Sequence, residues 1–391
     1  MTVRRRVASP VLLAFLILVS VVAAGWARGG REVVDHDDHH LEHHDHDHHD
    51  HHDHDHDHDH DHHDDHAKMV IPHIDAVALG AGERLRVVAS TSIIGDVVRQ
   101  VAGDAAAVTT LIPIGQNPHA WNPTPRAMVE VERAHVVFVN GLNLEEALMT
   151  AIERVSTGKI VPVSAGIVIL GDDDDHDHHD DHHDDHHDDH DDHHHDDHDD
   201  HDDHDDHDHA DGDPHFWFSP ANVMIWTRNI AEVLGDADPR NAAVFRSNAD
   251  EYVAQLEALD REIRSAVATI PAERRKLVVD HVALTYFAAD YGFEIIGAVI
   301  PSTSDQVEPS ARHVAALTEL IRHEGVPAVF VGGTANRGVR NLVTAVAREV
   351  GNEIRIGEIL TGSLSPAGTE GDTYIGFMRY NLTQIVNALT R

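Results

Sequence analysis

The sequence predicts an α/β protein of two lobes, each with a mostly parallel sheet flanked by helices, joined by one long linker helix. Two observations support this fold class. Short apolar segments alternate with helical segments in both halves of the chain, which is typical of βα units and parallel sheets. Between the halves, residues 239–269 carry an amphipathic stripe. At about 1.5 Å per residue this helix is long enough to cross from one lobe to the other.

The individual elements follow from apolar runs and from helix-start signals. Thr124 is the expected N-cap of one helix, with Pro125 in its first turn. In the first lobe, strands are expected at 86–90, 108–113, 136–139 and 159–163, and further helices at 93–102, 144–154 and 220–234. In the second lobe, strands are expected at 277–279, 295–299, 329–331 and 354–356, and helices at 284–291, 312–323, 337–350 and 374–389.

The chain is expected to divide into five parts. They are an export segment at 1–31, a disordered His/Asp-rich segment at 32–83, an N-terminal lobe at 84–238, the linker helix at 239–269 and a C-terminal lobe at 270–391. A second His/Asp-rich stretch, 172–209, interrupts the N-terminal lobe as a long loop. Neither stretch holds enough apolar side chains to form a core.

Two His/Asp tracts carry nearly all of the formal net charge of -40. Residues 35–66 contain 17 His and 14 acidic residues, and residues 172–209 contain 16 His and 22 Asp. Without these tracts the chain has 33 acidic against 29 basic residues, so no basic face is available for a nucleic-acid backbone. Nucleic acid is therefore excluded as an expected partner.

The amino terminus predicts export. Three arginines, Arg4 to Arg6, precede an apolar run at 7–27, as in a secretory signal. This run is either cleaved or kept as a membrane anchor, and the sequence leaves both readings open. The expected location is periplasmic or at the cell surface. Because the chain has no cysteine, thiolate metal sites, disulfides and a lipid-carrying cysteine are excluded.

Seven histidines lie outside the tracts, and two of them occur in a near-repeat. His119 and His215 each follow a proline and precede a tryptophan by two residues. Proline restricts the loop around each imidazole, so two similar loops suggest two histidines facing one target. The alternative is that both are ordinary loop histidines packed beside a tryptophan.

His281 and Asp372 are two further candidates. His281 follows the apolar strand 277–279, where ligands gather in open α/β sheets, and it is expected at the start of a helix. A helix amino terminus disfavours a cation, which a carboxylate ligand would offset. Asp372 offers such a carboxylate, although an Asp before a helix is also a standard N-cap. By contrast, we expect His135, His313 and His323 to lie on the surface and not to bind metal.

Enzyme signatures are missing from the sequence. It contains no H-E-x-x-H, G-x-S-x-G or P-loop motif, and the glycine-rich stretch 332–338 reads as a strand-to-helix turn. We therefore expect that the protein is not an enzyme.

Four motifs between residues 86 and 391 together resemble the zinc/manganese solute-binding proteins of ABC importers. Residues 117–125 are similar to the motif D-P-H-x-Y/W-x-P-T-P and residues 213–220 to D-P-H-x-W-x-x-P. Residues 281–292 resemble a His or Glu before Y-F-x-x-x-Y-G, and residues 372–381 resemble an Asp before T/S-Y and M-x-x-N. The family's zinc-type members also carry a His-rich loop.

The sequence departs from the family pattern at three places. Asn117 replaces an acidic residue, and Gly332 and Gly333 stand where many members have a Glu. The third motif reads Asp-His-Val at 280–282 in place of His-Asp-Ala, which keeps the ligand but changes its neighbours.

The resemblance implies a metal site of His119, His215, His281 and Asp372 in the cleft between the lobes. Three imidazoles and one carboxylate suit tetrahedral Zn2+ better than Mn2+, which stays the alternative cargo. The implied partners are an ABC importer permease with its ATPase, and the protein is expected to act as a monomer. The tracts would scavenge metal weakly, or else serve only as solvated linkers.

Two functions of other classes stay open on the residues alone. A secreted zinc hydrolase would keep one coordination position free and need a general base nearby. A metal-storing surface protein would need no permease.

Overall fold

The computed structural model describes residues 69–155, 159–171, 212–351 and 354–390, which fall within one compact unit, Asp64–Arg391. The apolar run at 7–27 and both His/Asp tracts lie outside these residues. Within the described ranges, no helix is both long and apolar enough to cross a bilayer.

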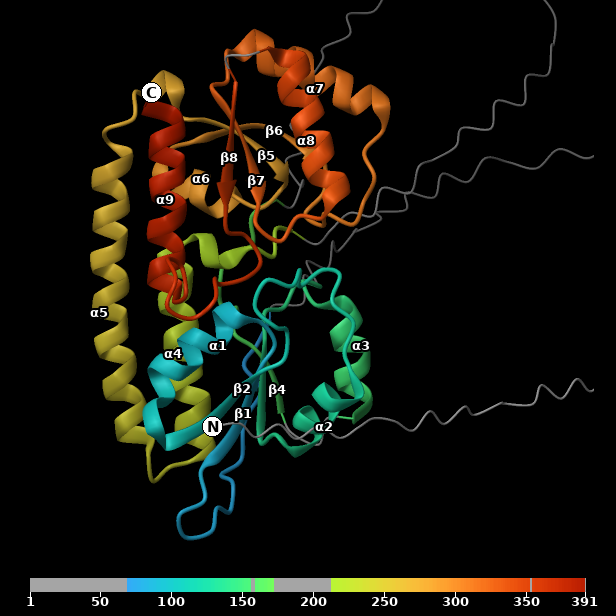
Figure 1. Cartoon of the computed structure of the whole chain (residues 1–391). Coiled ribbons are helices and arrows are strands. Elements are labelled where there is room, and N and C mark those ends of the chain that lie inside the picture. The colour runs from blue at the N-terminus through green and yellow to red at the C-terminus, as the bar shows by residue number, and fades with distance from the viewer. Residues whose placement is uncertain (1–68, 156–158, 172–211, 352–353, 391) are drawn as a thin grey trace, which may run out of the picture. The chain divides into compact units, whose positions relative to one another are not determined.

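The N-terminal lobe is built on a parallel sheet of strand order β2-β1-β3-β4. Its strands are β1 (Leu85–Ala89), β2 (Ala106–Thr110), β3 (Val136–Val139) and β4 (Lys159–Pro162). Helices α2 (Pro125–Arg133) and α3 (Glu146–Val155) cover one face, and α1 (Ser92–Ala102) covers the other (Figure 1). Because side chains alternate along a strand, Val136 and Phe138 pack towards α1 while Val137 and Val139 pack towards α2 and α3.

The C-terminal lobe repeats this arrangement with the order β6-β5-β7-β8, again parallel. Its strands are β5 (Lys276–His281), β6 (Glu294–Ile300), β7 (Ala328–Gly332) and β8 (Arg355–Ile359). Helices α7 (Ala311–Glu324) and α8 (Arg337–Val350) cover one face, and α6 (Thr285–Tyr291) and α9 (Tyr374–Thr390) the other (Figure 1).

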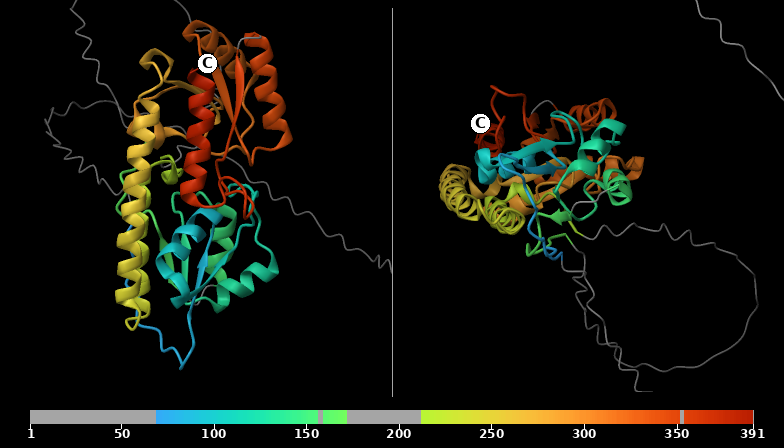
Figure 2. Two further views of the ribbon diagram at one scale, coloured as in Figure 1. Left: turned by 60° about the vertical axis from the view of Figure 1, so that its left-hand side comes forward. Right: turned by 90° about the horizontal axis from the view of Figure 1, so that it is seen from below.

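One long helix runs past both sheets. Helix α4 (Pro220–Ala237) leads into α5 (Ala242–Val267), whose 26 residues correspond to about 39 Å. Helix α5 contacts α1 of the first lobe and α6 and α9 of the second (Figure 2). Its buried stripe, which includes Phe245, Leu256 and Ile263, belongs to the same hydrophobic cluster as residues of both sheets. Separating the lobes would therefore disrupt a continuous core.

The predicted fold class is confirmed, and the element boundaries need small corrections. The linker helix was expected from Pro239 but begins at Ala242, because the Asp238 carboxylate accepts hydrogen bonds from Arg240 and Asn241 and shapes a turn. His281 was expected at a helix start, which is wrong: it is the last residue of β5, and α6 begins four residues later. The helix-terminus argument against a cation at His281 therefore does not apply.

Candidate metal-binding site

Three histidines from separate elements converge on one point. His119 lies in the loop between β2 and α2, His215 precedes the 3-10 turn Phe216–Phe218, and His281 ends β5. One ring nitrogen from each lies within 4.8 Å of the other two. The ring centroids are 5.3 Å apart for His119 and His215, 6.0 Å for His119 and His281, and 5.2 Å for His215 and His281.

The spacing of the nitrogens fits a tetrahedral metal. The Nε2 atoms of His119 and His215 are 3.2 Å apart. Two nitrogens at about 2.0 to 2.1 Å from one zinc ion, in tetrahedral geometry, would lie about 3.4 Å apart. The observed pair therefore needs only a small adjustment to share one ion.

Carboxylates fix the orientation of two of the imidazoles. Asp213 Oδ1 lies 2.7 Å from Nδ1 of His215, and Asp280 Oδ1 lies 2.9 Å from Nδ1 of His281. Each of these oxygens also accepts the backbone N–H of the same histidine. A proton held on Nδ1 by a carboxylate leaves the lone pair of Nε2 free for a metal, which is the usual arrangement of metal-binding histidines.

Asp280 is itself held in place by the backbone of the neighbouring strand. Its Oδ2 accepts a hydrogen bond from the Gly332 amide at 2.8 Å. A Cβ at Gly332 would lie 3.2 Å from this oxygen and 2.5 Å from Thr361 Oγ1. Glycine therefore allows β7 to approach close enough to orient the carboxylate.

Burial controls the protonation of the three rings. Burial lowers the pKa of His119 well below its ordinary value, helped by His215 and His281. Burial also lowers the pKa of His215, although Asp213 offsets part of the effect. Burial acts in the same direction on His281, but the Asp280 carboxylate outweighs it and the pKa of His281 is raised. Two of the rings are thus neutral and ready to bind a cation at neutral pH.

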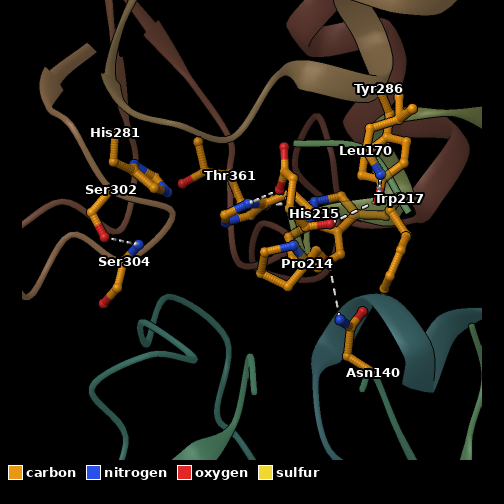
Figure 3. Close-up of polar contacts among 12 residues, drawn as sticks. Asn140, Leu170, Pro214, His215, Trp217, His281, Tyr286, Ser302, Ser304 and Thr361 are labelled. Carbon is orange, nitrogen blue, oxygen red and sulfur yellow. Dashed lines mark hydrogen bonds and ion pairs between the residues drawn. The ribbon is translucent and has the colours of Figure 1, made fainter. Parts of the chain in front are cut away.

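The loop that carries His215 is tied to both lobes (Figure 3). Asn140 Nδ2 donates to the Pro214 carbonyl at 2.9 Å, and Trp217 Nε1 donates to the Thr361 carbonyl at 2.9 Å. Tyr286 also donates its hydroxyl to the Asp213 carbonyl at 2.8 Å. These contacts position His215 before any ligand arrives.

The two halves of the His-x-Trp near-repeat are packed differently. The Trp217 ring is buried and lies edge-on to His215, with 5.2 Å between centroids. Trp121 is only partly buried and packs against the cluster around α2 and α3. His215 therefore lies beside a tryptophan, as the alternative expected, but it is not an ordinary loop histidine, because it also faces His119 and His281.

The fourth predicted residue, Asp372, is not part of this group. Its Oδ2 accepts the Gly368 amide at 2.8 Å, which closes the turn before α9. The side chain that accepts at the start of α9 is Thr373, from Gly376. The structure therefore places Asp372 neither beside the three histidines nor as the cap of the helix.

The remaining described histidines also lie outside the group. His313 contacts the Ala298 carbonyl at 2.8 Å and His135 contacts Arg86, while His73 and His323 are exposed beside Asp75 and Glu324. Sequence reasoning missed the roles of Asp213 and Asp280. The signal was present, since each acid lies within two residues of its histidine.

Comparison with known proteins identifies the family. The family model described as zinc-uptake complex component A, periplasmic, matches residues 87–388. The manganese-binding lipoprotein MntA of Halalkalibacterium halodurans is 31% identical over 311 residues, covering 79% of this chain and 90% of the relative. The manganese ABC transporter substrate-binding lipoprotein PsaA of Streptococcus pneumoniae serotype 4 is 28% identical, covering 80% and 91%.

Solved structures show the same fold. The periplasmic zinc binding protein TroA from Treponema pallidum matches with a TM-score of 0.65 and 26% identity, covering 79% of this chain and all of that one. A mutant of a periplasmic metal binding protein from Candidatus Liberibacter asiaticus, with manganese bound, matches with a TM-score of 0.63 and 26% identity, covering 78% of this chain and all of that one.

These findings confirm the resemblance that the four motifs predicted. Solute-binding proteins are non-enzymatic transport components, so the expectation that the protein is not an enzyme is also confirmed. The chain belongs to the family of zinc-uptake complex component A, the substrate-binding proteins of metal ABC transporters.

Proposed function

We propose that the protein captures Zn2+ with His119, His215 and His281 and delivers it to the permease of an ABC importer that is driven by its ATPase. The observation that carries this proposal is the convergence of three ring nitrogens within 4.8 Å of one another. Imidazole nitrogens favour zinc, whereas manganese favours oxygen ligands. Because the names of similar proteins include both metals, the donor set is the argument for zinc.

The geometry suits capture with little rearrangement. The Asp213 and Asp280 carboxylates already orient two rings, so zinc binding would not have to order them. His119 comes from the first lobe and His281 from the second, so a bound ion would connect the two lobes.

The other parts of the proposal rest on the sequence. We propose that the apolar run at 7–27 directs export, cleaved or kept as an anchor, and that the protein acts as a monomer in the periplasm or at the cell surface. The tracts at 35–66 and 172–209 would bind zinc weakly and raise its concentration near the cleft. The proposed lobes are 84–238 and 270–391, connected by 239–269.

Metal titration of single variants tests the site. Zinc affinity of the full chain is measured by competition with a chelator strong enough to strip the tracts. His119→Ala, His215→Ala and His281→Ala should each weaken the tight site strongly, while His313→Ala should not, because the His313 ring contacts the Ala298 carbonyl and lies outside the histidine group. An equal loss in all four variants would show that the site is misplaced.

Growth of cells separates zinc from manganese. Cells lacking this protein should grow poorly under zinc chelation and recover with added zinc but not with manganese. His281→Glu, which replaces a nitrogen ligand by an oxygen ligand, should weaken zinc retention. Rescue by manganese alone would overturn the zinc assignment and leave the importer assignment intact.

A further inference from the structure

Three imidazoles leave one position of a tetrahedral zinc site unassigned. The buried carboxylates of the described residues are candidates for it, namely Asp96, Glu145, Asp213, Asp238, Asp280 and Asp305. Five of these have another evident role. Asp213 and Asp280 orient histidines, and Asp238 pairs with Arg240. Asp96 accepts the Tyr374 amide, and Glu145 accepts from Ser90 and Asn140.

Asp305 is the remaining acid, and it lies between two of the metal-binding elements. It is 4% exposed and belongs to the loop 301–310 between β6 and α7. Its Oδ1 accepts from Asn117 Nδ2 at 2.6 Å, and Asn117 Oδ1 in turn accepts the backbone N–H of His119 at 3.1 Å. The contact therefore joins a loop of the second lobe to the His119 loop of the first.

The loop that carries Asp305 also lies beside His281. The start of this loop is held beside this histidine, since the Val282 amide donates to the Ser302 carbonyl at 2.9 Å. Figure 3 shows Ser302 and Ser304 next to His281.

The partners of Asp305 are amide groups and not cations. Within the described part of the chain, no Lys or Arg forms an ion pair with Asp305, and its hydrogen bonds come from Asn117 and Gln306. Helix α7 is capped by Ser310 and not by Asp305. Both hydrogen bonds go to Oδ1, so the negative charge of Asp305 could be neutralised further by a divalent ion.

The loop borders a cavity of about 400 Å³, lined by Val307 and Pro309 of the loop and by Val339 and Leu342 of α8. Hydrogen bonds from the Ser304 amide to Ser302 Oγ and from the Gln306 amide to Ser304 Oγ keep the segment 302–306 locally ordered. The segment 302–306 is therefore held together as a unit beside this cavity.

We propose that Asp305 is the carboxylate that completes the coordination of the metal held by His119, His215 and His281. This inference rests on the proposed function. Oδ1 keeps its hydrogen bond to Asn117, and Oδ2, which accepts no hydrogen bond from the described residues, takes the fourth position when the loop 301–310 closes. The closure would link both lobes through the ion and shield it from water.

Two substitutions separate ligation from hydrogen bonding. Asp305→Asn keeps an oxygen that can accept from Asn117 but removes the anionic ligand. Asn117→Ala removes the contact between the loops and keeps the carboxylate. Asp372→Asn is the matched control, because Asp372 lies outside the histidine group.

The measurements are zinc affinity of the full chain, by chelator competition, and the visible spectrum of the Co2+-loaded protein. Asp305→Asn should weaken zinc binding by about 100-fold or more, since even the partners of ligands cost 10- to 100-fold. It should also change the Co2+ ligand-field bands. Asn117→Ala should weaken binding less and leave the bands in place, and Asp372→Asn should match the wild type.

Three results would overturn the inference. Wild-type affinity and an unchanged Co2+ spectrum in Asp305→Asn, with affinity still lost in His281→Ala, would remove Asp305 from the site and leave the proposed function intact. Equal losses in Asp305→Asn and Asn117→Ala, with unchanged bands, would reduce Asp305 to a contact between the lobes. Absence of a tight site in the wild type would overturn both this inference and the proposed function.

Discussion

Replacing Asp280 by Asn tests how the fold prepares His281 for a metal. The carboxylate accepts from three N–H groups: Oδ1 faces Nδ1 and the backbone N–H of His281, both at 2.9 Å, and Oδ2 faces the Gly332 amide at 2.8 Å. An amide has only one oxygen, so its NH2 group must face either His281 or Gly332. If it faces the imidazole, Nδ1 must accept and the proton moves to Nε2, where it blocks the metal. If it faces Gly332, two donors oppose each other.

Zinc affinity should fall by about 10- to 100-fold, or about 1.4 to 2.8 kcal/mol, which is the usual effect of removing a carboxylate that orients a metal-binding histidine. A second effect acts in the opposite direction. Asp280 raises the pKa of His281, so Asp280→Asn also removes some competition by protons near neutral pH. At pH 8 this competition is small, and the loss of orientation should then dominate.

The assay is zinc competition at pH 8, with Asp260→Asn as the control because Asp260 contacts Arg264 and Tyr291 away from the histidines. NMR of the metal-free variant should show a lower pKa for His281. Affinity within about twofold of the wild type, against the expected loss of tenfold or more, would refute the orienting role of Asp280.

Three further predictions concern pH, packing and the tracts. As pH decreases, zinc affinity should fall first where His281 becomes protonated, because its pKa is raised; protonated His281 should also stabilise the metal-free fold below about pH 6.5, and this stability is lost as pH rises through the folded pKa. NMR-monitored titration checks both expectations. If His119, whose pKa is lowered, were protonated before His281 as the pH falls, this order would be contradicted. Gly362→Ala should weaken zinc binding and destabilise the fold by about 1 to 3 kcal/mol in urea unfolding, because the new Cβ would lie 2.5 Å from Pro118 Cδ next to His119. Unchanged zinc affinity would show that this packing does not position the His119 loop. Deleting residues 172–209 should lower the number of bound zinc ions and leave one tight site in a metal titration, and loss of the tight site would place it in the tract.

Local sequence patterns were sufficient for the fold. The apolar strands and amphipathic helices are visible in short windows, and caps such as Thr124, which accepts the Ala127 amide, mark helix starts directly. Boundaries were less accurate where a side chain reshaped a turn, as Asp238 does before α5. The parallel direction of the strands follows from the alternation of strands and helices along the chain.

The candidate site could be predicted only in part. The loops around His119 and His215 and the strand end at His281 have local signatures, and the topology places them together. Asp372 stood in a family-like motif before a helix, yet its carboxylate closes a local turn. Asp305 meets Asn117 across 188 residues of sequence, and a short window around either residue contains no sign of that contact.

A crystal structure of the zinc-loaded protein, with anomalous diffraction recorded at the zinc edge, would show directly whether the three histidines hold the metal. We expect one strong peak between the lobes, about 2.0 to 2.1 Å from Nε2 of His119, His215 and His281. A structure in which these three nitrogens surround no peak, while zinc is found elsewhere on the folded chain, would contradict the proposed site.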